Sequence, residues 1–234
     1  MRYIFFIALI SIASSCMHSR TGSGNIITEK RTAGNFREVR ASGGVTVHLK
    51  TGPETAITVE ADDNIIHYVE TTVSGGTLTI RIRELNSLSN VTLNVYVTAP
   101  TLSKISASAG ADIDSKDMIA STEKVSVHAS SGGSIHVNLD APSVSLNGSS
   151  GAEIMATGRT RDLTADASSA AAIHAFGLHA ENVTAGASSS GEIAVFGSVS
   201  INASASSAGS VNYKGGAPSV KKNESSGGSV EARN

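Results

Sequence analysis

The sequence contains no tryptophan, a single cysteine and few aromatic residues, which make up 4% of its 234 positions. One cysteine cannot form an intramolecular disulfide, so stability must come from buried apolar surface and hydrogen bonds. Pockets that hold small-molecule substrates are usually lined by apolar and aromatic side chains. The scarcity of aromatic residues therefore argues against a substrate cleft like those of polysaccharide-cleaving enzymes, and we expect that the chain is not an enzyme.

The sequence also lacks an excess of charge of either sign. Its 18 Lys and Arg residues nearly balance its 20 Asp and Glu residues, and they are scattered along the chain. Proteins that bind nucleic acid carry a basic stripe or patch, so we expect no nucleic-acid partner. There is no HExxH motif, no Gly-x-Ser-x-Gly elbow and no glycine-rich loop that opens a helix. The sequence therefore predicts neither a metal site nor a cofactor.

The N-terminus has the organisation of a bacterial lipoprotein signal. A basic start precedes an apolar run over residues 4–12, which is too short to span a bilayer, and three small residues then lead to Cys16. We predict a signal peptide over residues 1–15, lipidation of Cys16 that anchors the chain to a membrane, and a flexible tether over residues 16–25. The residue after the cysteine is Met17 and not the aspartate that favours retention in the inner membrane, so we expect the outer membrane. The alternative is an ordinary cleaved signal with an incidental cysteine.

A repeated sequence motif, or phrase, from about residue 105 onward predicts the fold. Ser-Ser-Gly, or a close variant, precedes an isoleucine or valine by three residues, and these apolar residues recur every 18 to 22 positions, at Ile113, Ile135, Ile154, Ile173, Ile193, Val211 and Val230. Such a sustained period, about 19 residues, is typical of a solenoid. Between the phrases apolar and polar residues alternate as in strands. We predict an all-β, right-handed parallel β-helix that forms one domain over residues 26–234, with regular coils over 105–234.

Alignment of the repeats predicts which side chains share a column. Phe176 and Phe196 occupy the same place in adjacent repeats, so we expect them to stack and to form a candidate binding surface for a glycan or a protein. The paired serines are expected to satisfy the turns from coil to coil. Lys222 replaces a small or apolar inward residue, which predicts a polar C-terminal cap. A corner that needs an unusual backbone conformation is expected at Gly158, Gly177, Gly197 and Gly215.

The first part of the mature chain is less regular. Ser-Gly-Gly phrases at residues 42–44 and 74–76 lead into alternating segments, so residues 26–104 are predicted to form longer, irregular coils. Residues 63–70 (DNIIHYVE) place Ile65, Ile66 and Val69 on one side. They predict one short helix that covers the N-terminal end.

Several segments in this order resemble one known family. Residues 36–39 (FREV), 42–45 (SGGV), 57–64 (ITVEADDN) and 95–102 (VYVTAPTL), followed by the Ser/Gly-rich repeats, resemble the GIN domain, the head of auto-transporter adhesins, found largely in lipoproteins of Bacteroidetes. The resemblance covers nearly all of the mature chain. It implies a β-helical fold and an exported location, and it brings no catalytic or ligand-binding residues with it.

The best candidate for chemistry is an acidic group. Asp112 and Asp114 share one strand face and Asp117 follows, so they are a candidate cation site or carboxylate pair, although a solvated outer face explains them as well. The histidines near the Ser-Gly turns lack cysteine partners and metal-ligand spacing. Three functions remain open: an adhesin or surface-interaction module, which we favour, a carbohydrate-active enzyme, and a structural protein of the envelope.

Overall fold

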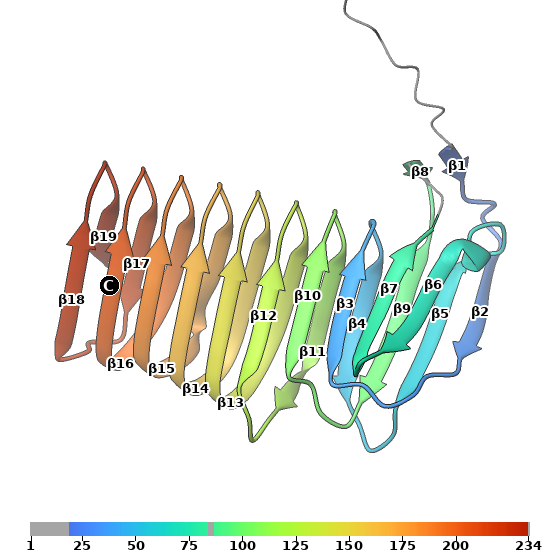
Figure 1. The fold of residues 1–234 in the computed structure, drawn as a ribbon, viewed down its shortest axis with the longest axis horizontal. Helices are drawn as coiled ribbons and strands as arrows, with labels where there is room; N and C mark the ends of the chain where they lie inside the picture. The colour runs from blue at the N-terminus through green and yellow to red at the C-terminus, as the bar shows by residue number, and fades with distance from the viewer. Residues whose placement is uncertain (1–18, 84–86, 234) are drawn as a thin grey trace, which may run out of the picture.

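The computed structural model describes residues 19–83 and 87–233, and these form a solenoid of stacked, flattened β-coils (Figure 1). The predicted fold, an all-β parallel β-helix, is confirmed. Each coil has two strand faces, joined by a sharp turn on one edge and a gentler bend on the other, and it winds right-handed. The strands of the regular part are β10 (Lys104–Ser108), β11 (Asp112–Ala120), β12 (Val125–Ala129), β13 (Ser134–Gly148), β14 (Glu153–Ala167), β15 (Ala172–Ala187), β16 (Glu192–Ala205), β17 (Ser210–Lys214), β18 (Ser219–Glu224) and β19 (Ser229–Ala232).

The repeated apolar residues form a continuous row inside the solenoid. Ile154 pairs with Ile135 on one side and with Ile173 on the other, and the row continues through Ile193 to Val211. Ile135, Ile154, Ile173 and Ile193 are fully buried. Because each coil contributes only a few large apolar side chains, burial and strand hydrogen bonds are shared between neighbours, and a single coil could not fold alone.

The sharp turns stack through their backbone. In the turn that starts at Ser168, the N–H of Ala171 donates to the Ser168 carbonyl at 3.1 Å, and Ser169 and Ala170 have φ values of 52° and 61°. This is the geometry of a type I′ turn. The N–H of Ala170 donates to the Ser189 carbonyl of the next coil at 3.1 Å. In the described part of the chain, no hydrogen bond uses the hydroxyl of a turn serine. The paired serines therefore satisfy the turns from coil to coil, as expected, through their backbone carbonyls rather than through their hydroxyls.

The bend edge is less regular than the turn edge. Gly158 and Gly215 have left-handed φ values of 109° and 111°, as expected of a corner. Gly177 and Gly197 do not, and Gly177 pairs with Thr157 rather than with Gly158. The predicted glycine column is therefore wrong, because the bends differ in length and shift the register from coil to coil.

The N-terminal part is irregular, as predicted, because it mixes parallel and antiparallel strands. β3 and β4 pair in parallel with β10 and β11 and continue the solenoid, whereas β2, β5 and β6 make antiparallel pairs near its N-terminal end (Figure 1). The helix predicted over residues 63–70 is reduced to one 3-10 turn, η1 (Ile66–Tyr68). The strands here are β1 (Ser19–Thr21), β2 (Ile26–Arg31), β3 (Glu38–Ser42), β4 (Thr46–Thr51), β5 (Ala56–Asp62), β6 (Val69–Ser74), β7 (Thr77–Ile82), β8 (Ser87–Ser89) and β9 (Leu93–Ala99).

Residues 19–25, expected to belong to a flexible tether, are bound to the domain. β1 pairs with β8, and Asp62, which is 1% exposed, accepts the backbone N–H of Gly24 at 2.7 Å and that of Thr92 at 2.8 Å. Asp63 accepts hydrogen bonds from Ser23 and Asn25. The polar composition that suggested a free tether instead supplies donors to the Asp62–Asp63 carboxylates.

The C-terminal end carries the predicted polar cap. Lys222 pairs with Ala203 of the previous coil, and its ammonium donates to the Val230 carbonyl at 3.0 Å. The Glu224 carboxylate accepts the N–H of the same valine. These two side chains satisfy backbone groups of the last coil that would otherwise invite pairing with another chain.

No helix in the described segments is long and apolar enough to cross a membrane.

Candidate functional site

Two hollows on the described surface bring together side chains that could bind a partner. The first, which we call the bend cleft, has a volume of about 580 Å³ and lies at the bends of β13 to β16, where it is lined among others by Asp140, Arg159, Arg161, His179 and Phe196. The second, which we call the Tyr96 groove, has a volume of about 590 Å³ and lies where the irregular strands meet the first regular coils.

An aromatic stack lies in the bend cleft. The rings of Phe196 and His179 are stacked at 4.4 Å between centroids, with 17° between their planes. These residues pair directly across β15 and β16, because the register shifts between Ala175 and His179. The exposed histidine and half-buried phenylalanine give the cleft an aromatic surface that a partner can reach.

Guanidinium groups border this stack. Arg159 donates to Asp140 at 2.6 Å and Arg161 to Asp162 at 2.9 Å, and these hydrogen bonds lower the pKa of both carboxyls below their ordinary values. The arginine side chains remain 74% and 63% exposed. Exposed arginines beside an aromatic stack are frequent anchors of protein interfaces.

Phe176 and Phe196 do not form the predicted column. Phe196 pairs with His179, and residues 176–178 have no partner in β16. The Phe176 ring instead lies 5.0 Å from the ammonium of Lys214 and does not line the bend cleft. The candidate surface is thus divided: Phe196 lies in the bend cleft, and Phe176 lies outside it.

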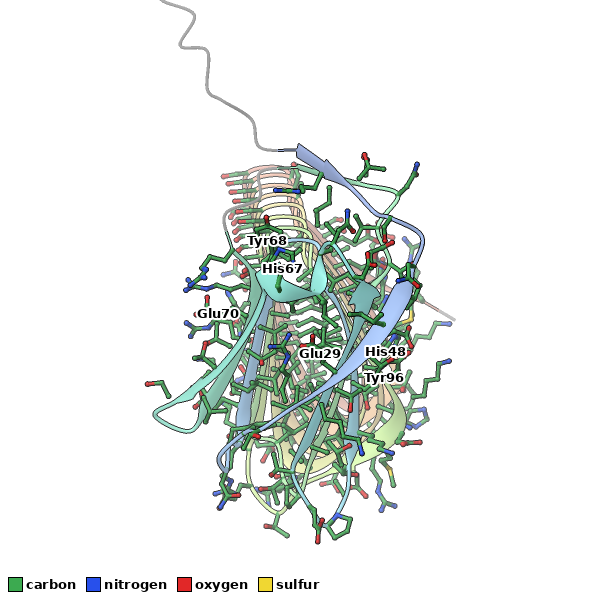
Figure 2. All side chains as sticks on the ribbon, turned by 90° about the vertical axis from the view of Figure 1, so that its right-hand side faces the viewer. Glu29, His48, His67, Tyr68, Glu70 and Tyr96 are labelled. Carbon is green, nitrogen blue, oxygen red and sulfur yellow. The ribbon has the colours of Figure 1, made fainter. Side chains whose placement is uncertain are left out.

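The Tyr96 groove is built by four strands. His48 on β4 pairs with Tyr96 on β9 and with Asp114 on β11, and Thr58 on β5 pairs with Tyr96 from the other side. Tyr96 and His48 are stacked at 5.0 Å with 24° between the rings, and Figure 2, which looks onto the N-terminal end, shows them side by side. Tyr96 is 43% exposed, so a partner can reach its ring.

A β-bulge forms one wall of this groove. The register of β11 against β13 shifts between Asp114 and Met118, and the Ser115 hydroxyl closes the bulge by donating to the Asp117 carbonyl at 2.7 Å. Lys116 and Asp117 are exposed there and line the groove with Asp114. Bulges often redirect side chains next to functional sites.

The predicted acidic group is therefore only partly brought together. Asp114 and Asp117 line one groove, but Asp112 does not, and His48 has its Nδ1 4.0 Å from Asp114 Oδ2. Among the described residues, no group of three or more His, Cys, Asp or Glu could hold a metal ion. Cys16, the predicted lipidation site, lies outside the described residues.

Sequence reasoning named Asp114 and Asp117 but missed His48 and Tyr96. One usable signal was present, because His48 and Asp114 each stand four residues after the last glycine of a turn phrase, Gly44 and Gly110. No comparable phrase precedes Tyr96.

Comparison with known proteins agrees with this architecture. The family described as "Putative auto-transporter adhesin, head GIN domain" matches residues 35–217. A crystal structure of a putative adhesin from Bacteroides fragilis is similar with a TM-score of 0.84 and 19% identity, over 92% of this chain and 100% of that one. No protein with a curated description matches the sequence.

Two further crystal structures share the fold. A putative lipid binding protein from Parabacteroides distasonis has a TM-score of 0.70 and 19% identity, over 92% of this chain and 100% of that one. A putative adhesin from Parabacteroides merdae has a TM-score of 0.66 and 18% identity, over 93% and 100%.

Proposed function

Because the chain belongs to the GIN-domain family of auto-transporter adhesin heads, we propose that it is a non-enzymatic lipoprotein of the cell envelope that binds the surface of another cell or matrix. The observation that carries this proposal is the Phe196–His179 stack, open to solvent and bordered by Arg159 and Arg161. Aromatic and arginine side chains supply most of the energy at protein interfaces. The partner is a protein or glycan with groups that pair with guanidinium, and the lipid on Cys16 holds the chain at the outer membrane.

The bend cleft is tested by Phe196→Ala. We expect the variant to bind matrix proteins, glycans or partner cells about tenfold more weakly, since a buried aromatic anchor of an interface contributes on the order of 1–2 kcal/mol. Retention of the purified chain on immobilised matrix, glycan and cell panels measures this. Phe176→Ala is the matched control, because it removes the same ring outside the cleft. Absence of binding across the panels would favour a structural envelope protein, and equal loss in both variants would exclude the cleft as the contact.

The anchor is tested by Cys16→Ser. Thioether formation needs the cysteine sulfur, so the variant is expected to lose incorporated lipid label almost completely and to appear in the soluble fraction. Radiolabelled fatty-acid incorporation and membrane fractionation measure the two effects. Ser15→Ala, which keeps a small residue before the cysteine, is the control and is expected to remain lipidated. Membrane association of Cys16→Ser equal to that of the unaltered chain would contradict the lipoprotein assignment.

A further inference from the structure

We propose that the Tyr96 groove is a saccharide-binding site, separate from the bend cleft and independent of the adhesin role proposed above. It combines an exposed aromatic ring with carboxylates and ammonium groups around one hollow of about 590 Å³. That volume lies within the usual range of small-ligand pockets.

Tyr96 provides a platform with one ring face covered and the other open. His48 stacks on the ring at 5.0 Å from one side. On the other side the paired residue is Thr58, and Ala56 also lines the groove. These side chains are too small to cover a phenol ring, so the ring face toward β5, away from His48 and Asp114, is open. The C–H face of a pyranose ring packs against such a surface, because it is apolar and carries slightly positive hydrogens toward the ring.

The rim of the groove offers hydrogen-bonding groups of both kinds. Asp114 and Asp117 present carboxylate acceptors, and Lys50 and Lys116 present ammonium donors. A sugar hydroxyl both donates and accepts, so adjacent hydroxyls of one ring can bind a carboxylate and an ammonium together. Hydrogen bonds to charged groups are the stronger ones, and because His48 lies between Tyr96 and Asp114, they bind a neighbouring ring of an oligosaccharide rather than the ring stacked on the tyrosine.

The same charges disfavour other small ligands. The two carboxylates would repel a phosphate or a nucleotide, and the two lysines would repel a quaternary ammonium. A ligand that is polar, carries many hydroxyls and has one apolar face fits the groove best. A single aromatic platform with charged groups on its far side indicates weak binding of a short oligosaccharide, and many copies of the chain on one surface would strengthen it through multivalency.

The test is titration of the purified full chain with free cello-, chito-, manno- and galacturono-oligosaccharides at millimolar concentration. The chain has four tyrosines, of which Tyr96 lines the groove, so binding is measured by calorimetry rather than by tyrosine fluorescence. We expect at least one of these oligosaccharides to bind. Tyr96→Ala is expected to raise its Kd by about tenfold, corresponding to the loss of one stacking contact. Tyr96→Phe keeps the ring, and its Kd is expected to stay within about twofold of that of the unaltered chain.

Two further variants separate this site from the rest of the molecule. Lys116→Ala changes only an exposed side chain on the bulge, cannot disturb the core, and is expected to weaken the same oligosaccharide measurably. Phe196→Ala leaves the groove intact and is expected to bind the same oligosaccharide with an unchanged Kd. The proposal is overturned if no oligosaccharide binds the unaltered chain, or if binding survives both Tyr96→Ala and Lys116→Ala.

Discussion

Replacing Gly158 with alanine is expected to destabilise the solenoid by about 3 kcal/mol or more, among the largest effects of any single methyl group added to this chain. Gly158 has a φ of 109°, which L side chains rarely adopt, and a Cβ at this position would lie 2.0 Å from the Leu139 carbonyl oxygen of the preceding coil. That oxygen belongs to the backbone of a parallel ladder in which Gly158 pairs with Leu139 and Leu178. The methyl group can be accommodated only by displacing β13 from β14 at this point. Urea unfolding followed by far-UV circular dichroism measures the change.

Gly151→Ala is the matched control. Gly151 also has a left-handed φ, 68°, but a Cβ there would meet nothing within 4 Å. The equivalent turn positions in two other coils are already occupied by Ala170 and Ala208 at φ values near 60°. We therefore expect a loss of only about 1 kcal/mol. Equal destabilisation by the two variants would mean that backbone conformation alone, and not the contact with Leu139, explains the requirement for glycine at the bend.

The turn edge of the solenoid was predictable from sequence, and the bend edge was not. Each turn uses four residues with the same backbone geometry, so the phrase recurs visibly and fixes the row of isoleucines. The bends carry no such phrase. Between β15 and β16 they differ in length, and residues 176–178 have no partner in β16. Counting a constant distance from Ile173 and Ile193 therefore paired Phe176 with Phe196, whereas the structure pairs His179 with Phe196.

The Tyr96 groove shows a second limit of sequence reasoning. His48 and Asp114 meet because equivalent positions of two turn phrases become neighbours across parallel strands, and alignment of the phrases contains that information. Tyr96 reaches them through β9, which pairs in parallel with β4 and antiparallel with β5. No repeat specifies this mixed pairing, since it depends on how the antiparallel strands close the end of the solenoid.

Asp62→Ala is expected to release the N-terminal segment and to lower the free energy of unfolding by about 3 kcal/mol. The carboxylate is buried and accepts the N–H groups of Gly24 and Thr92 at 2.7 and 2.8 Å. Alanine would remove the acceptor of both donors, and a hydrogen bond to a charged group contributes on the order of 1.5–3 kcal/mol. Urea unfolding and hydrogen exchange at the Gly24 and Thr92 amides measure both consequences.

Asp63→Ala distinguishes the loss of the two Asp62 hydrogen bonds from a general effect of removing negative charge. Asp63 also binds this segment, through Ser23 at 2.6 Å and Asn25 at 2.8 Å, and these hydrogen bonds lower its pKa. Its contacts are exposed, however, so water can replace the carboxylate, and we expect a much smaller loss of stability. Asp62→Asn is expected to fall between the two alanine variants, since the amide oxygen still accepts one N–H while the amide nitrogen faces the other donor. If hydrogen exchange at Gly24 stayed slow in Asp62→Ala, the pairing of β1 with β8 would hold the segment without the carboxylate.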